Sequence, residues 1–447
     1  MTQNRMPIAD SGTTARDIVL VAALAALLHV AIAFLLADPA AAFLLGDRAE
    51  DRLRKMAEFA AAGDLPGQLA VLFRIGSPGD YMPFWPAYAA GGYGLVVVMN
   101  TALHLVGLVY LYRLATDFFP RRVALLACAI YALLPSSLYH PHTLSSEAIV
   151  NPLLIAACFH AARMLSAIRP RWQDAIWFCA FCAVAIWVRN INALLPAFAA
   201  SLLFFRFGLR LRTIAVAAVL LAGSHVLTLS WTVTQHTVGA GYEHVLSLHG
   251  LGSNLYWRAA RFTPISGVEI DPDIQARKSM TIGEFAAEVA RQPGAYARTL
   301  YTDGVNFIAN SGMTMVFGRY FGLFHVDGGE TAEMLTWRDI RDRQGFWASV
   351  VAMAKQSPGS FWPNVIGFAM HAAMLVAAGV AALAFLAHGV APLATRMLLV
   401  FWPVYYFVFS FIAASSRWDL RSPTEFLIVL FLSVGLLRCA RGRSPPT

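Results

Sequence analysis

Long apolar runs separated by short polar segments follow one another along the whole chain. A helix that crosses the hydrocarbon core of a bilayer needs about 20 mostly apolar residues. Runs that reach or approach this length cover residues 18–36, 93–112, 123–138, 147–165, 175–188, 193–205, 213–231, 363–388, 397–414 and 425–437. The pattern therefore predicts an all-α polytopic membrane protein with about ten transmembrane helices.

Polar residues interrupt the apolar stretch between residues 175 and 205. Arg189, Asn190 and Asn192 lie in its middle. Because polar groups without partners are costly in hydrocarbon, we expect two short helices that meet at an interface. A single tilted helix is the alternative.

Arginines gather in every second connection between the apolar runs. With the N-terminus inside, the cytoplasmic segments contain Arg113, Arg121, Arg122, Arg163, Arg169, Arg171, Arg206, Arg210, Arg212, Arg396, Arg438, Arg441 and Arg443. Short cytoplasmic loops of membrane proteins carry such an excess of basic residues. The sequence therefore predicts a multi-pass protein of the cell (inner) membrane, with both termini cytoplasmic.

The polar segments on the other side are the longer ones. They cover residues 38–92, 135–146, 189–192, 232–362 and 415–424. We divide the chain into an N-terminal transmembrane module (1–231) with a first outer loop (38–92), a non-cytoplasmic loop region (232–362) and C-terminal transmembrane helices (363–447). Since the cytoplasmic connections are too short to hold a site, we expect the chemistry on the periplasmic or extracytoplasmic side.

Composition supports a membrane protein and excludes other classes. Of 447 residues, 58% are hydrophobic and 13% are charged, against about 25% charged in soluble domains. The net charge of +8 comes from basic residues at the ends of apolar runs rather than from a basic stripe, so no nucleic-acid partner is expected. Five cysteines are too few for a disulfide framework. The first apolar run is longer than the core of a cleavable signal peptide.

Three acids lie close together directly after the first apolar run. Asp47, Glu50 and Asp51 would share one face of a helix. A carboxylate at the membrane interface can act as a general base or bind a divalent cation. The alternative is a solvated helix whose acids pair with Arg48, Arg52, Arg54 and Lys55.

An aromatic segment follows in the same loop. Tyr81, Phe84, Trp85 and Tyr88 stand among prolines and glycines that disfavour a regular helix. Such rings suit the headgroup zone of a bilayer. They could equally form a wall for a lipid tail or a sugar, and the sequence leaves both interpretations open.

The second outer segment contains His140 and His142 and leads into Glu147. The two histidines could ligate a metal, although their spacing is no established ligand signature. Glu147 begins an apolar helix, where an acid complements the helix dipole. An acid buried at the start of a membrane helix is also a candidate functional residue.

The last outer segment carries Arg417 and Arg421 on the side where the positive-inside rule does not favour arginine. The planar guanidinium suits a phosphate group. These arginines therefore indicate an anionic headgroup, or else they pair with Asp419 and Glu425.

Taken together, these segments resemble the GT-C glycosyltransferases, in particular the branch with the protein O-mannosyltransferases and the lipid A aminoarabinose transferases. The likeness spans nearly the whole chain in the same order. Its motifs are Gly46-Asp47 with the small helix at 56–64, the aromatic segment at 79–88, Ser146-Glu147, the segments 230–235 and 250–256, and the closing motif at 417–423.

The resemblance implies roles for several residues. Asp47 would be the catalytic base of an inverting transfer, and Glu147 would orient the acceptor or bind a metal. Arg417 and Arg421, with Arg189, would neutralise the leaving phosphate. The acceptor or sugar pocket would contain Glu50, Tyr81, Trp85, His140, His142, Asn254 and Trp418.

The implied partners are a polyprenyl-phosphate-linked sugar, a cell-envelope acceptor (lipid, glycan or protein) and the lipid bilayer. A lipid-linked donor needs no nucleotide cofactor. The resemblance leaves open whether a divalent cation is required. The rival functions are a transporter or flippase of a lipid-linked intermediate, which favours midplane charges and internal repeats, and a non-catalytic envelope scaffold.

Overall fold

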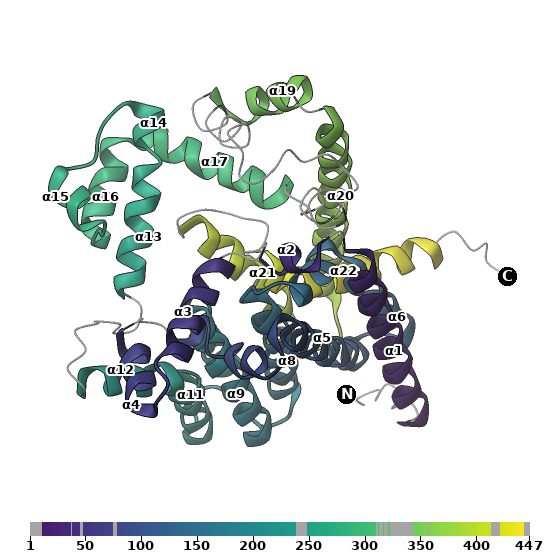
Figure 1. Cartoon of the computed structure of the whole chain (residues 1–447). Coiled ribbons are helices and arrows are strands. Elements are labelled where there is room, and N and C mark those ends of the chain that lie inside the picture. Colours follow the sequence, from purple (N-terminus) through teal and green to yellow (C-terminus); the bar gives the residue numbers. More distant parts are fainter. Residues whose placement is uncertain are drawn as a thin grey trace.

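The described part of the chain consists of helices and loops and contains no strand (Figure 1). The computed structural model describes residues 11–36, 38–44, 48–74, 78–237, 248–309, 312, 316, 321, 340, 344–356, 358–412 and 421–441. The predicted class, an all-α polytopic membrane protein, is confirmed.

Every apolar run of the sequence has become a helix or a bent pair of helices. Those in the N-terminal half are α1 (Ser11–Leu35), α5 (Trp85–Phe118), α6 (Arg121–Leu133) with α7 (Pro135–Tyr139), α8 (Glu147–Ser166), α9 (Trp172–Val188), α10 (Leu195–Phe207), and α11 (Leu211–Ser224) with α12 (Val226–Thr237). Those in the C-terminal part are α20 (Pro358–His388), α21 (Leu393–Ile412) and α22 (Glu425–Arg441).

The number of crossings depends on how the bent and short helices are counted. Six helices of the described chain are long and apolar enough to span a membrane, or up to 8 if each bent pair is one span. The two bent pairs turn by 59° and 50°, and α9 and α21 provide two shorter apolar segments. The count of about ten stays a prediction.

Helix α8 forms the centre of the bundle. In the most apolar 18-residue window of α8, 89% of the residues are buried inside the protein. In the corresponding window of α1, 17% are buried. A helix that is apolar on all sides is suited to such a central position. Close packing against α5 depends on Gly107, where a Cβ atom would lie 3.0 Å from the Cβ of Pro152 in α8.

The polar break in the run 175–205 separates two short helices, as predicted. Helix α9 ends at Val188, and a short 3-10 turn, η3 (Asn190–Asn192), leads into α10. The buried Asn192 amide donates to the carbonyl of Ala185 at 2.9 Å, and its oxygen accepts from the hydroxyl of Tyr406 in α21. The amide thus satisfies the polar backbone of the break inside the bundle.

Replacement of Asn192 by alanine is expected to destabilise the fold by about 1–3 kcal/mol, because the buried Tyr406 hydroxyl loses its acceptor. The measurement is the thermal unfolding midpoint of the purified protein in detergent. Asn190→Ala is the matched control, since Asn190 is exposed in the same turn. Equal effects of the two changes would contradict the structural role of Asn192.

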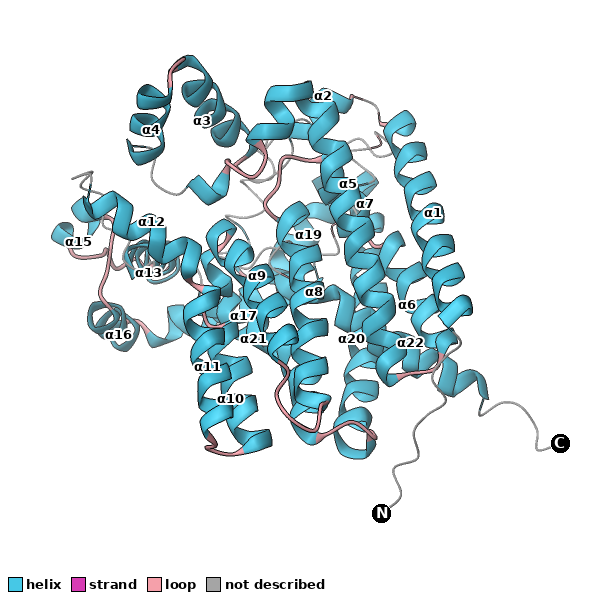
Figure 2. Cartoon of the chain, turned by 90° about the horizontal axis from the view of Figure 1, so that it is seen from below, coloured by secondary structure: helices cyan, strands magenta, loops and turns pink. Residues whose placement is uncertain are grey.

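Two groups of shorter helices lie outside the apolar runs. The first outer loop contains α2 (Pro39–Leu44), α3 (Ala49–Ala61), α4 (Leu65–Arg74) and the 3-10 turn η1 (Pro78–Asp80). Figure 2 shows α2, α3 and α4 at one end of the bundle and the connection from α10 to α11 at the other. The region 232–362 contains α13 (Leu248–Ala260), α14 (Thr263–Ser266), α15 (Pro272–Arg277), α16 (Ile282–Arg291), α17 (Pro293–Ala309) and α19 (Phe346–Gln356).

Candidate functional site

The loop before α8 is fastened to the first outer loop on both sides of Asp47. The backbone N–H of Leu144 donates to the carbonyl of Phe43 at 3.0 Å. The Nη1 of Arg52 donates to the carbonyl of Leu144 at 2.9 Å. Asp47 itself lies outside the described residues. Leu144 thus connects both flanks of this acid to a position three residues before Glu147.

Arg52 is the centre of this connection. Its side chain is 2% exposed on α3 and also donates from Nη2 to the Asp80 carboxylate at 2.8 Å. Arg52 lies on the same face of the helix as Met56 and Phe59, which are buried too. The guanidinium therefore ties α3, η1 and the loop before α8 together.

The solvated-helix interpretation of α3 is correct for one face only. Asp51 pairs with Arg54 at 2.6 Å and with Lys55 at 2.8 Å near the surface. Partial burial raises the pKa of Asp51, but hydrogen bonds from Lys55 and Arg54 outweigh this, so its pKa lies below the usual value. Arg52 differs from these residues, because it is buried and pairs with Asp80 of η1.

Glu147 is the first residue of α8, and its side chain is buried. It forms an ion pair with Arg189, the residue that directly follows α9. The Oγ of Ser146 donates to the same carboxylate at 3.2 Å. The positive charge of Arg52 also acts on Glu147. The buried carboxylate is therefore stabilised by arginines from two different segments.

A second polar group lies next to the start of α22. Arg421 is fully buried; its Nε donates to Glu425 at 3.3 Å, and its Nη1 donates to the carbonyl of Phe307. Glu425 also accepts from the hydroxyl of Ser136 in α7. Burial lowers the pKa of Arg421, and the nearby Glu425 carboxylate raises it in part. The guanidinium still stays charged. The pairing of Arg421 with Glu425, which was the alternative to an anionic headgroup, is therefore present in the structure.

Asn151 connects the two polar groups. It follows Glu147 by one turn of α8, and its amide donates to the hydroxyl of Ser422 at 3.1 Å. Ser422 is the neighbour of Arg421 and begins the 3-10 turn η6 (Ser422–Thr424). Glu147, Arg189 and Arg421 therefore belong to one buried polar layer at one end of α8.

The two histidines of the second outer segment turn to different partners. His140 contacts the hydroxyl of Ser145 at 3.0 Å through Nδ1, and the Nε2 of His142 lies 3.1 Å from the Nδ1 of His29 in α1. The His29 ring packs edge-on against His104 of α5. Within the described parts of the chain, no group of three or more His, Cys, Asp or Glu residues is placed to hold a metal ion.

The remaining predicted pocket residues are spread over several environments. Tyr81 is fully buried, and burial raises its pKa to about 12. Trp85 is half-buried and packs edge-on against Phe59 of α3, with ring centroids 5.2 Å apart. Glu50 on α3 and Asn254 on α13 are exposed. Arg417 and Trp418, like Asp47, lie outside the described residues.

Four residues of the site were missed in the sequence analysis: Arg52, Asp80, Asn151 and Ser422. Asn151 could have been found, because it is a polar residue within an apolar helix, one turn from Glu147. Arg52 could have been found from its spacing with Met56 and Phe59. No sequence signal indicates that Asp80 is its partner.

The described structure is that of a multi-pass membrane protein with a buried polar layer beside its outer loops. No protein-family model and no curated protein matches the chain. A search of solved structures finds ArnT from Cupriavidus metallidurans, crystallised with undecaprenyl phosphate, at 14% identity over 95% of this chain and 78% of that one, with a TM-score of 0.39.

Proposed function

We propose that this chain is a membrane glycosyltransferase that moves a sugar from a polyprenyl-phosphate-linked donor onto a cell-envelope acceptor at the outer face of the membrane. One observation carries the proposal: the segments on both sides of Asp47 are hydrogen-bonded to Leu144, three residues before the buried Glu147. These bonds support our proposal that two acids from separate outer loops act in one region. The order of the sequence motifs supports the same assignment.

The reaction is a displacement at the anomeric carbon. Asp47 removes the proton from an acceptor hydroxyl or amine as the acceptor oxygen or nitrogen attacks this carbon. The bond to the phosphate oxygen breaks, polyprenyl phosphate leaves with the bonding electrons, and the anomeric configuration is inverted. Glu147, held by Arg189, orients the acceptor.

Arginines neutralise the charge that develops on the leaving phosphate. Electrostatic groups fixed in advance at such a position lower the barrier without reorganisation during the reaction. Arg189 and Arg421 belong to the buried polar layer of the site, and Arg417 would add a third charge. The apolar polyprenyl chain lies among the membrane-spanning helices.

Loss of the gene product is expected to remove one sugar from the cell envelope. The experiment compares envelope lipids, glycans and proteins of a deletion strain with those of the parent by mass spectrometry. A plasmid copy of the wild-type chain should restore the sugar. A complete envelope in the deletion strain argues against the enzyme, and accumulation of a lipid-linked sugar on the inner leaflet points to a transporter or flippase.

Replacement of Arg52 by glutamine is expected to lower sugar transfer by about 10²-fold, because a small displacement of catalytic groups is sufficient for such a loss. The change removes the link between α3, Asp80 and Leu144. Restoration of the missing sugar in the deletion strain measures the effect. Arg54→Gln is the matched control on the exposed face of α3. If both variants restore the sugar equally well, Arg52 does not position the site.

A further inference from the structure

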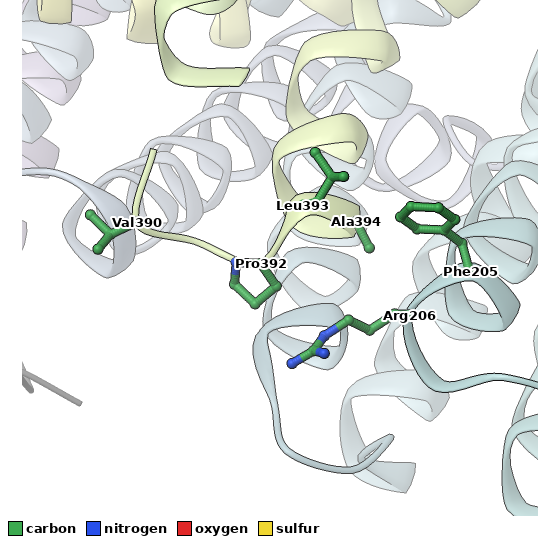
Figure 3. A pocket seen from close by; sticks show the side chains of 6 residues that line it. All are labelled: Phe205, Arg206, Val390, Pro392, Leu393 and Ala394. Atoms are coloured by element: carbon green, nitrogen blue, oxygen red, sulfur yellow. The ribbon is translucent and has the colours of Figure 1, made fainter. Parts of the chain in front are cut away.

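A pocket of about 400 Å³ opens between the end of α10 and the start of α21 (Figure 3). Phe205 and Arg206 of the last turn of α10 form one side, and Val390, Pro392, Leu393 and Ala394 form the other. Leu393 begins α21, whose Tyr406 contacts Asn192 beside the site. Tyr406 follows Leu393 by 13 positions along α21, a helical rise of about 20 Å, so the pocket and the site lie near opposite membrane surfaces.

The walls of the pocket are apolar and exposed. Phe205 is 60% exposed, Val390 is 91% exposed and Leu393 is 44% exposed. Large apolar side chains at the end of membrane-spanning helices are suited to contact with lipid. A small hydrophilic ion would leave these walls uncovered, whereas an acyl chain would cover them.

Arg206 supplies the polar recognition element. Figure 3 shows its side chain extending toward the connection that carries Pro392. Its Nε is 3.4 Å from the carbonyl of Leu165, and its guanidinium stacks over the ring of Phe207. Neither Nη atom donates a hydrogen bond to the residues that the structure describes. Two N–H groups suited to a phosphate thus remain at the pocket.

The surroundings of the pocket favour an anion. The nearby connections carry Arg163, Arg169, Arg171, Arg210, Arg212 and Arg396. Among the acids at this end, Asp174 is engaged by His160 at 2.9 Å and by Arg163 and Arg171 at 3.9 Å each, so Arg169, Arg210, Arg212 and Arg396 contribute most of the positive charge. The backbone N–H groups in the first turn of α21 also lack intrahelical acceptors. A positive field beside exposed apolar walls matches a molecule that joins a phosphate to hydrocarbon chains.

We propose that this pocket binds one anionic phospholipid of the adjacent leaflet, with the phosphate at Arg206 and an acyl chain along Phe205 and Leu393. This site is separate from the donor and acceptor region. The bound lipid would hold the end of α10 and the start of α21 in place. These two helices lead to the break at η3 and to Tyr406.

The test uses the full-length protein, extracted from equimolar phosphatidylglycerol and phosphatidylcholine bilayers into mild detergent. Native mass spectrometry then counts the retained lipids. The wild type should keep one phosphatidylglycerol, and Arg206→Gln should weaken its retention by about fivefold, the loss of one arginine at a membrane surface. Arg210→Gln, which changes an exposed arginine outside the lining of the pocket, should weaken lipid retention clearly less than Arg206→Gln does.

A second variant and a competitor separate the possible origins of binding. Phe205→Ser should also weaken lipid retention, because it removes an apolar wall while keeping Arg206. Inorganic phosphate should not displace the lipid. Equal losses in Arg206→Gln and Arg210→Gln would overturn the proposal in favour of diffuse surface charge. Displacement by inorganic phosphate, or retention unchanged in Phe205→Ser, would overturn the assignment of a lipid.

Discussion

Replacement of Asp47 by asparagine is expected to reduce sugar transfer by about 10²–10⁴-fold, the contribution of a positioned general base. Asparagine keeps the size of the side chain but cannot take up the proton of the acceptor. The measurement is the amount of the missing envelope sugar that the variant restores in the deletion strain, divided by the amount of the variant protein in the membrane. We expect near-normal membrane levels with almost no restoration.

Asp51→Asn is the matched control for this experiment. Asp51 belongs to the same outer loop and pairs with Arg54 and Lys55 on the exposed face of α3. Its loss removes the same formal charge from the region, so we expect transfer close to that of the wild type. If the Asp47 variant transfers sugar at the wild-type rate, the catalytic role of Asp47 is refuted.

The membrane helices and their interruption could be predicted from the sequence for a physical reason. Lipid solvates apolar side chains and leaves backbone groups to be satisfied within each helix, so local composition determines where a helix can lie. The same constraint identified Arg189, Asn190 and Asn192 as a break. At this break the structure shows the Asn192 amide bonded to the backbone carbonyl of Ala185 in α9 and to that of Arg189, the residue that follows α9.

The contacts that assemble the site could not be predicted in the same way. Leu144 meets Arg52 across 92 residues, and Ser422 meets Asn151 across 271. Such pairings follow from how the helices pack, which no local pattern records. Arg421 illustrates this limit. The sequence shows its partner Glu425, which follows one turn later. The sequence does not show the hydrogen bond of Arg421 to the carbonyl of Phe307.

Glu147 and Arg189 provide a second large expected effect, in which stability and catalysis can be separated. Glu147→Gln removes the carboxylate partner of Arg189, whose side chain is largely buried. Breaking a buried ion pair from one side costs about 3–5 kcal/mol, because a buried charge loses its compensation. We therefore expect a clearly lower unfolding midpoint in detergent, a lower amount in the membrane and no sugar transfer.

The double variant Glu147→Gln with Arg189→Gln distinguishes the two contributions. It removes both charges, so much of the lost stability should return, while transfer should stay absent because neither the acceptor nor the phosphate is held. The partly exposed pair Arg277–Glu284 between α15 and α16 is the control. The same double exchange there should leave the midpoint and transfer nearly unchanged, because a glutamine at position 284 can still accept from the N–H of Thr281. Recovery of transfer together with stability in the Glu147–Arg189 double variant would show that the pair is structural, and the reaction would then depend on Asp47 without Glu147.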